Sequence, residues 1–486
     1  MGRDRIMPVR VLFVSSEVEP YSKTGGLGDV SGALPACLQS MGHDVTVVTP
    51  LYSRVRDGGH HLLKVFDSVP VPAAGNHEFS AYVAEDGRTW FVDFPALYSR
   101  SGVYTNDPDE HLRFLFLTHA AVELSRRRGW APAIAHGNDW HTGMLPLFLK
   151  SIYADDPLFS STRSIFTIHN LGYQGVFGAD ILSDLSLGDH EHLLHQDHLR
   201  KGMINFMEHA LLYADAITTV SPTYAREIQT PERGAGLDGL LRRRSNDLFG
   251  ILNGIDLNVW NPRTDPYLRA QYSERTVGDK LINKRHLLRS KNLDPNMDVP
   301  LMGVISRLTG QKGVELMIRP LARLLADGRI RLVALGSGEK KLEDALEWLA
   351  MSFPGRAFYH RGYDEPLAHL IEGGADVFLM PSLYEPSGLN QMYSLAYGTV
   401  PVVRRTGGLA DTVSHYDPET GEGTGFVFDQ YSEDGLIWAM DQALRTFPDE
   451  NAWRRMQLNG MAEDNSWETR AGEYDELYRR LNGDPG

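Results

Sequence analysis

Residues 11–41 read VLFVSSEVEPYSKTGGLGDVSGALPACLQSM and contain the unit from which the fold is built. The β-branched run from Val11 to Glu17 is typical of a strand. A glycine-rich loop follows it, and Ser31 to Met41 has the pattern of a helix. A strand that leads through a loop into a helix is the repeating unit of a parallel sheet with helices on both faces.

The same alternation continues to about residue 255 and then starts again. Further strands of the first series are expected at Asp44 to Pro50, Thr89 to Pro95, Ile134 to Asp139, Ser164 to Asn170, Ala216 to Pro222 and Phe249 to Ile255. Those of the second are expected at Leu301 to Arg307, Arg331 to Gly336, Ala357 to Gly362, Val377 to Pro381, Val400 to Arg405 and Gly425 to Asp429. We therefore predict an α/β chain with two doubly wound parallel sheets.

Two sheets imply two large domains, and the densest run of turn-forming residues, Asn253 to Pro262, separates them. The charged, amphipathic tail from Trp467 to Leu481 predicts a terminal helix. The expected division is residues 1–255 for the N-terminal domain, 256–265 for the linker, 266–462 for the C-terminal domain, and 463–486 for a helix that crosses back onto the N-terminal domain.

Composition limits the classes of function. The 486 residues include 63 acidic and 48 basic side chains, for a formal net charge of −15, so we expect no nucleic-acid partner. The one cysteine, Cys37, cannot form an internal disulfide and lies in an apolar helix pattern. The sequence shows neither a secretory signal nor an apolar run long enough for a membrane span, so we expect a cytoplasmic protein with no membrane partner.

Ligands of open parallel sheets bind beyond the carboxyl ends of the strands, and polar residues gather there in both halves of the chain. The first half offers Ser15-Ser16-Glu17, His136-Gly137-Asn138-Asp139, His169-Asn170 and Asn253, and the second offers Ser306-Arg307, Gly336-Ser337-Gly338, Glu385 and Thr406-Gly407-Gly408. Two such edges that face each other across a cleft would form one active site.

The loop after the first strand, Lys23 to Val30, combines a lysine with three glycines before a helix. Close backbone approach, helix N–H dipoles and the charge of Lys23 favour an anion. A simple connector with a solvated lysine is the alternative. The third glycine of the dinucleotide fingerprint is replaced by Ser31, and no Gly-x-x-x-x-Gly-Lys phosphate loop is present.

Two cations, Arg307 and Lys312, lie five residues apart on a loop that follows a strand. Preorganised cations stabilise the charge that grows on a diphosphate leaving group, although a surface pair could merely be solvated. Glu385, in a turn shaped by Pro386 and Gly388, can accept hydrogen bonds from sugar hydroxyls. The paired glycines after Thr406 open a helix and can receive phosphate.

The histidines do not predict a metal site. His136 and His141 lack the His-Glu-x-x-His arrangement of zinc hydrolases, so a hydrogen-bonding role is favoured. A second group, His190, His192, His195 and His198, has partial helical spacing and is interpreted as a solvated polar face.

The chain resembles the glycosyltransferase family 5 enzymes, the ADP-glucose-dependent bacterial glycogen synthases and plant-type starch synthases. The resemblance runs in family order from residue 15 to about 413. It is carried by Lys23-Thr24-Gly25-Gly26-Leu27-Gly28-Asp29, Asp139-Trp140-His141, Phe166 to Gly175, Asn253-Gly254-Ile255-Asp256, Ser306-Arg307-Leu308, Gln311-Lys312-Gly313, Glu385-Pro386-Ser387-Gly388-Leu389 and Thr406-Gly407-Gly408-Leu409.

The resemblance implies a GT-B fold, in which two Rossmann-like domains face an interdomain cleft. It also implies transfer of glucose from ADP-glucose to the non-reducing end of glycogen or another α-1,4-glucan, with retention of configuration. Neither a metal nor a cofactor is expected, since ADP-glucose is the donor substrate.

The same resemblance implies a set of catalytic residues: Arg307 and Lys312 at the donor phosphates, Lys23 at the phosphate and acceptor side, Glu385 at the donor glucose, and Asp139 and His169 at the sugar from the opposite domain. Further donor contacts are implied for Gly25, Gly26, Asn253, Ser387, Gly388, Leu389, Thr406, Gly407 and Gly408. In this family the backbone carbonyl of the His169 equivalent faces the anomeric carbon, so the imidazole need not transfer a proton.

Two positions depart from related sequences. Ser387 stands where many relatives have cysteine, and the second acid of the broader Glu-x7-Glu motif falls on Tyr393, which leaves the ribose contact unassigned. The alternatives to a glycogen synthase are a transferase that uses UDP-glucose or a maltosyl acceptor, a glucan phosphorylase, and a non-catalytic glucan-binding module.

Overall fold

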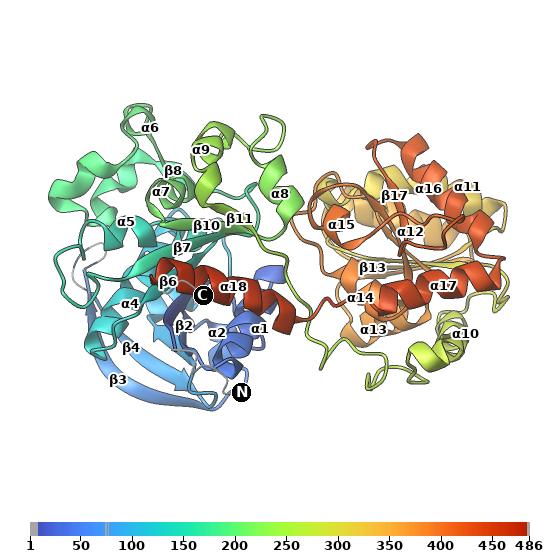
Figure 1. Ribbon diagram of the computed structural model, residues 1–486, viewed down its shortest axis with the longest axis horizontal. Coiled ribbons are helices and arrows are strands. Elements are labelled where there is room, and N and C mark those ends of the chain that lie inside the picture. The colour runs from blue at the N-terminus through green and yellow to red at the C-terminus, as the bar shows by residue number, and fades with distance from the viewer. Residues whose placement is uncertain (1–7, 73–74, 76, 484–486) are drawn as a thin grey trace. The chain divides into compact units, whose positions relative to one another are not determined.

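The computed structural model describes residues 8–72, 75 and 77–483. The chain divides into two α/β units (Figure 1). Unit 1 consists of Met1–Leu252 and Trp467–Gly486, and unit 2 of Asn253–Ser466. Each unit has its own largely parallel sheet, so the prediction of two α/β sheets is confirmed. Among the described residues, none of the helices has both the length and the apolar character of a membrane span.

The sheet of unit 1 has nine strands. They are β1 (Arg10–Val14), β2 (Asp44–Pro50), β3 (Leu62–Val71), β4 (His77–Ala84), β5 (Thr89–Asp93), β6 (Ile134–Asn138), β7 (Arg163–Ile168), β10 (Ala216–Thr219) and β11 (Leu248–Gly250). Their order is β11-β10-β7-β6-β1-β2-β5-β4-β3, and the seven predicted strands run parallel. The edge strands β3 and β4 form an antiparallel hairpin that was not predicted, because β3 is mostly exposed and lacks a continuous apolar run.

Helices cover both faces of this sheet. They are α1 (Gly26–Ser40), α2 (Ser53–Arg56), α3 (Pro95–Tyr98), α4 (Glu110–Arg127), α5 (Leu145–Leu149), α6 (Gln196–Arg200), α7 (Phe206–Tyr213), α8 (Pro222–Glu227), α9 (Asp238–Arg243) and α18 (Trp467–Leu481), with a short ribbon of β8 (Val176–Gly178) and β9 (Met203–Asn205). Alternate residues of β1 point to opposite faces. Val11 and Phe13 pack with residues of α1 and α18, whereas Leu12 and Val14 pack with α4.

The terminal helix α18 is part of the core of unit 1. Trp467, Tyr474 and Tyr478 are buried in the same cluster as Val11 of the central strand. The Tyr478 hydroxyl also lies 2.7 Å from Nδ1 of His136, a buried histidine of β6. Burial lowers the pKa of His136 to about 3, so this imidazole is neutral and has the hydrogen-bonding role that was favoured for it.

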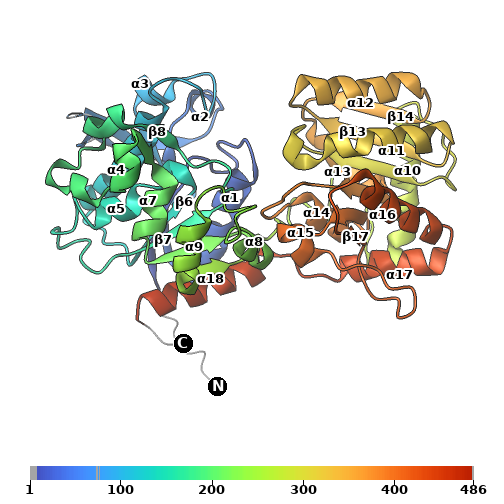
Figure 2. The same ribbon diagram turned by 90° about the horizontal axis from the view of Figure 1, so that it is seen from above.

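Unit 2 contains six parallel strands in the order β14-β13-β12-β15-β16-β17. They are β12 (Leu301–Ile305), β13 (Arg331–Gly336), β14 (Ala357–Arg361), β15 (Val377–Met380), β16 (Val400–Arg404) and β17 (Phe426–Phe428). All six were predicted. The helices, seen from above in Figure 2, are α10 (Lys280–Ser290), α11 (Val314–Ala326), α12 (Lys340–Ser352), α13 (Glu365–Gly374), α14 (Asn390–Ala396), α15 (Gly407–Thr412), α16 (Glu433–Thr446) and α17 (Glu450–Met461).

The segment expected to be a linker, residues 256–265, is packed into unit 2. The indole ring of Trp260 stacks between the rings of His369 and Tyr393, each with a centroid distance of 3.9 Å. Asp265 is buried and accepts hydrogen bonds from Tyr397 and His369. The chain instead divides after Leu252 and again after Ser466. The aromatic stacking of Trp260 and the hydrogen bonds of Asp265 hold residues 256–265 to the unit that follows.

The packing of α18 generates a stability prediction. Replacing Tyr478 with Phe leaves the buried nitrogen of His136 without its partner, and we expect a loss of about 1–3 kcal/mol. Tyr478→Ala also leaves a cavity, and we expect a loss of about 3–5 kcal/mol. Urea denaturation of the full chain measures both changes, with Leu63→Ala on exposed β3 as the control. Wild-type midpoints for both variants would contradict the packing of α18 described here.

Candidate active site

The carboxyl ends of three adjacent strands of unit 1 bring its polar residues to one edge. β1 leads into Glu17, β6 into Asp139, and β7 into His169. β6 pairs with β1 on one side and with β7 on the other, so the three strand ends are neighbours. This edge is the position at which open α/β sheets bind ligands.

Asp139 follows β6 in an uncommon conformation, with φ of 55° and ψ of 176°. A non-glycine residue keeps positive φ only where its surroundings require it. Here the carboxylate Oδ1 accepts the backbone N–H groups of His169 at 2.8 Å and of Asn170 at 3.3 Å. Burial raises the pKa of Asp139 to about 7, although the two hydrogen bonds lower it. The group therefore changes charge near neutral pH.

The imidazole of His169 is held in one tautomer. Its Nε2–H donates to Oδ1 of Asn138 at 3.0 Å, and the Asn138 amide nitrogen donates in turn to the Val14 carbonyl at 3.1 Å. Burial lowers the pKa of His169 to about 3, so the ring is neutral at physiological pH. A neutral ring in a fixed tautomer positions the backbone of residue 169 rather than supplying a charge.

The loop that contains Lys23, Gly25 and Gly26 is attached to the buried carboxylate of Glu17. This carboxylate accepts hydrogen bonds from the Thr24 backbone N–H and hydroxyl and, at 3.2 Å, from the Gly25 N–H. Gly25 is the N-cap of α1, and an added Cβ there would meet open space. Lys23 forms an ion pair of 2.6 Å with Asp29 in the first turn of α1.

Tyr104 joins the two parts of this edge. Its hydroxyl donates to Glu17 at 2.5 Å, and its ring stacks on His141 with a centroid distance of 4.7 Å. His141 lies two residues after Asp139, so one aromatic side chain contacts both Glu17, to which the glycine-rich loop is attached, and the segment after β6. Tyr104 was not among the predicted site residues, because it lies in a loop between helices and no motif surrounds it.

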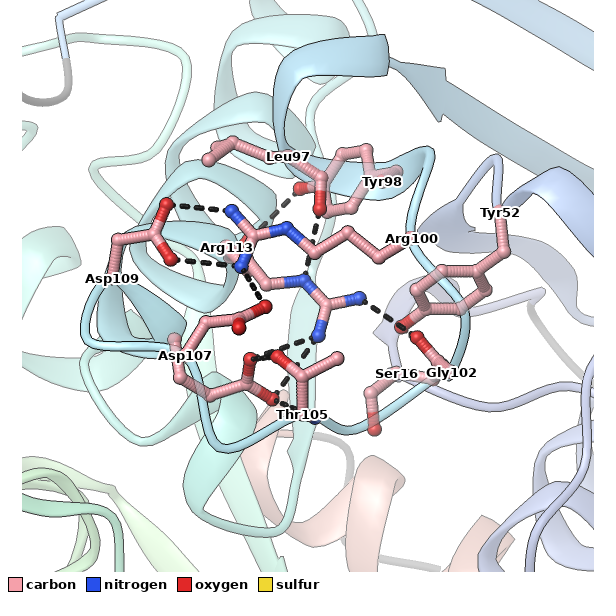
Figure 3. Close-up of polar contacts among 11 residues, drawn as sticks. Ser16, Tyr52, Leu97, Tyr98, Arg100, Gly102, Thr105, Asp107, Asp109 and Arg113 are labelled. Carbon is pink, nitrogen blue, oxygen red and sulfur yellow. Dashed lines mark hydrogen bonds and ion pairs between the residues drawn. The ribbon is translucent and has the colours of Figure 1, made fainter.

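Arg113 holds the loop that carries Tyr104 (Figure 3). The guanidinium is fully buried in α4, where it pairs with Glu110 at 2.9 Å and donates to the Leu97 carbonyl at 2.9 Å. A second contact reaches the Gly102 carbonyl at 3.4 Å. A buried charge must be paired and hydrogen-bonded, so these contacts determine the path of residues 97–110. Figure 3 also shows Arg100 with Asp107 and Asp109, which close the same loop.

In unit 2 the predicted donor residues Lys312 and Glu385 are brought together. The Lys312 ammonium donates to Oε2 of the buried Glu385 at 2.6 Å, and the Ser382 hydroxyl donates to the same oxygen at 3.0 Å. Arg307 is exposed, and within the described part of the chain it makes no ion pair. The loop thus offers one cation paired with a carboxylate and one directed to solvent.

Glycines allow the loops of this site to pack against one another. A Cβ on Gly407 would lie 1.9 Å from the Glu385 carbonyl oxygen, and one on Gly408 would lie 2.0 Å from that of Ser387. The Gly408 N–H donates to the Glu385 carbonyl at 3.0 Å. The paired glycines were predicted to receive phosphate, and in the structure the Gly408 N–H bonds to the backbone of the Glu385 loop. At Gly313, φ is 70° and a Cβ would lie 2.1 Å from the Pro381 oxygen.

The remaining predicted donor contacts are also located in unit 2. Ser387, Gly388 and Leu389 lead into α14, and the Gln391 amide donates to the carbonyls of Ser387 and Gly388. Asn253 is buried, and none of the described residues donates a hydrogen bond to its Oδ1. Tyr393, at the position of the second acid, stacks on Trp260 and therefore has a packing role in the structure.

Comparisons with known proteins support one family. Residues 10–243 match the starch synthase catalytic domain, and residues 288–457 match the glycosyl transferases group 1. Glycogen synthase from Anaeromyxobacter dehalogenans (strain 2CP-C) is 47% identical over 480 residues, which cover 97% of this chain and 100% of that protein. Glycogen synthase from Myxococcus xanthus (strain DK1622) is 44% identical, with 97% and 99% coverage. The chain belongs to the glycogen and starch synthase family.

A solved structure of this glycogen and starch synthase family has the same fold. The catalytic domain of starch synthase IV from Arabidopsis thaliana, bound to ADP and acarbose, matches with a TM-score of 0.91 and 34% identity over 98% of this chain and 100% of that one. Sucrose-phosphate synthase from Thermosynechococcus elongatus, at 17% identity and a TM-score of 0.61, supports the fold alone. The chain is thus a glycosyltransferase with the GT-B fold and the function of a glycogen or starch synthase.

The ionisation of Asp139 generates a prediction. Because its folded pKa of about 7 lies above the ordinary value, the protonated carboxyl stabilises the fold at low pH, and this contribution is lost as the pH rises through 7. Asp139→Asn cannot ionise and keeps the accepting oxygen. We expect its stability relative to wild type to rise by about 1–4 kcal/mol between pH 4 and pH 8.

Thermal unfolding at several pH values measures this difference. Asp57→Asn, at an exposed position of unit 1, is the control and should show no such trend. A constant difference between Asp139→Asn and wild type over the same range would show that Asp139 ionises normally.

Proposed function

We propose that this protein transfers glucose from ADP-glucose to the non-reducing end of an α-1,4-glucan such as glycogen, with retention of configuration. The observation that carries the proposal is the group of Lys312, Glu385 and the exposed Arg307 beyond the strand ends of unit 2. Two cations suit a diphosphate, and a buried carboxylate suits the hydroxyls of a hexose. A related starch synthase has been solved with ADP and acarbose bound, which supports an adenine nucleotide and a glucan.

We further propose front-face displacement as the mechanism. The bond from the anomeric carbon to the diphosphate oxygen breaks while the bond to the acceptor hydroxyl oxygen forms on the same face. The leaving phosphate takes the proton of that hydroxyl, and Arg307 and Lys312 stabilise the negative charge on the phosphate. The neutral ring of His169, engaged through Nε2 by Asn138, favours a positioning role for this residue.

In this proposal the positive charge at the leaving group comes from the protein, so we expect transfer to need neither a metal nor a cofactor. The proposed roles of Asp139 and Lys23 at the sugar and acceptor agree with their attachment to the polar edge of unit 1. A cytoplasmic location is consistent with the single, half-buried cysteine, Cys37.

A transfer assay tests the donor. ADP-glucose and UDP-glucose are presented separately with glycogen, in the presence of chelator. We expect chain extension from ADP-glucose. Equal or better extension from UDP-glucose would indicate the related transferase, maltose-sized products would indicate a maltosyl acceptor, and transfer from neither donor would favour a phosphorylase or a binding module.

Loss of one cation tests the transition-state role. We expect Arg307→Ala and Lys312→Ala each to lower kcat by about 100-fold or more, the scale for one lost contact to a developing charge. Arg319→Ala removes an exposed arginine of the same unit, paired with Glu433, and should leave kcat unchanged. Near-wild-type turnover of Arg307→Ala would show that this arginine is only solvated.

A further inference from the structure

Two histidines and a glutamate come together in unit 1, and none of the three is among the predicted site residues. His195 precedes α6, His198 lies in α6, and Glu208 lies in the first turn of α7. Their ligand atoms all lie within 4.8 Å of one another, and they are the one such group of three or more among the residues that the structure describes. The sequence pattern was interpreted as a solvated face, but here two of its four histidines contact a buried carboxylate.

The burial of Glu208 makes this group unusual. Its side chain is 5% exposed, whereas those of His195 and His198 are each 32% exposed. Within the described part of the chain, no lysine or arginine pairs with the Glu208 carboxylate. A carboxylate removed from water needs hydrogen-bond donors or a compensating positive charge, and a metal ion can supply the charge. Two imidazoles that are open to solvent on one side leave a path by which a cation can reach it.

The distances are close to those of a metal site. Nδ1 of His198 lies 2.7 Å from Oε2 of Glu208, and Nε2 of His195 lies 3.9 Å from Oε1. Ligands of a tetrahedral zinc ion, at about 2.0–2.2 Å from the metal, are roughly 3.3 Å apart, so shifts of about 1 Å would form the site. Half-exposed histidines can make such shifts by rotating their side chains.

The backbone behind the site is already held in place. The backbone N–H of His195 donates to Nε2 of the buried His209 at 3.1 Å, and Nδ1 of His209 lies 2.7 Å from the Asn205 carbonyl. Metal binding at Nε2 of His195 would place its proton on Nδ1 and break only the long 3.3 Å bond from the His198 N–H. The change at His195 is therefore small.

We propose that His195, His198 and Glu208 bind a divalent transition-metal ion, with zinc as the best match. Two imidazoles and one carboxylate are a ligand set that zinc accepts, and water would complete the coordination. The ion would join α6 to α7. Asn205 and Phe206 at the start of α7 bond to Gln174 and Gly175, so the metal would restrain a helix that contacts the segment after His169. This site is structural and independent of the proposed transfer reaction.

Zinc binding by the tag-free full-length chain tests the proposal. After incubation with zinc and dialysis, we expect about one zinc per chain, and in a competition assay with a chelating dye we expect His195→Ala/His198→Ala and Glu208→Gln to bind at least about 100-fold more weakly. Zinc at a concentration of about 100 times the dissociation constant should raise the Tm of wild type by about 3–8 °C. The same zinc concentration should leave the Tm of both variants unchanged.

Two controls account for adventitious binding. His190→Ala/His192→Ala removes the neighbouring pair, and His61→Ala removes an exposed histidine beside Glu85. Both should bind zinc as wild type does. Absence of zinc from wild type, or equal affinity in all variants, would overturn the proposal. If Glu208→Gln folds poorly, His198→Ala takes its place, with circular dichroism to show that it folds. Loss of the visible absorption of bound Co²⁺ in His198→Ala would support the site, and absorption equal to that of wild type would overturn it.

Discussion

The structure depends on how carboxylates that are removed from water obtain hydrogen-bond donors. Glu17, Asp139 and Glu385 all lie at loops that follow strands, and each is buried. An ionised carboxylate in such a position requires donors or cations from neighbouring elements. Asp139 accepts hydrogen bonds from backbone N–H groups, and Glu17 accepts them from the glycine-rich loop and a tyrosine. Glu385 accepts them from a lysine and a serine. These pairings determine the paths of the loops at both polar edges.

The pairing of buried carboxylates with neighbouring loops also brings backbones into close contact. Where one loop supplies donors to another, the chains approach so closely that a Cβ has no room, as at Gly313, Gly407 and Gly408. Of these, Gly407 and Gly408 were predicted to receive phosphate, because paired glycines at the start of a helix can bind an anion. In the structure, their main effect is to let the loop after β16 lie against the loop of Glu385, which positions that carboxylate beside Lys312.

Much of the fold could be predicted because buried parallel strands are continuous apolar runs. The β3–β4 hairpin could not, since an exposed edge strand lacks that signal. The segment around Trp260 contains turn formers and therefore resembled a linker. In the structure the Trp260 indole is stacked between the rings of two residues that are distant in sequence. Of the polar edge of unit 1, Asp139 and His169 were predicted from their position after strands, whereas Tyr104 and Arg113 depend on contacts that no local pattern reveals.

The sequence by itself determined the α/β class, the strands of the parallel sheets, the family resemblance and the polar residues at the strand ends. Each of these depends only on local periodicity and on the order of motifs along the chain. Only the tertiary structure decided which groups pair and which ionise. Asp139 has a raised pKa, His169 a lowered one, and Glu208 meets two histidines, because burial and donor count depend on residues that are distant in sequence and adjacent in space.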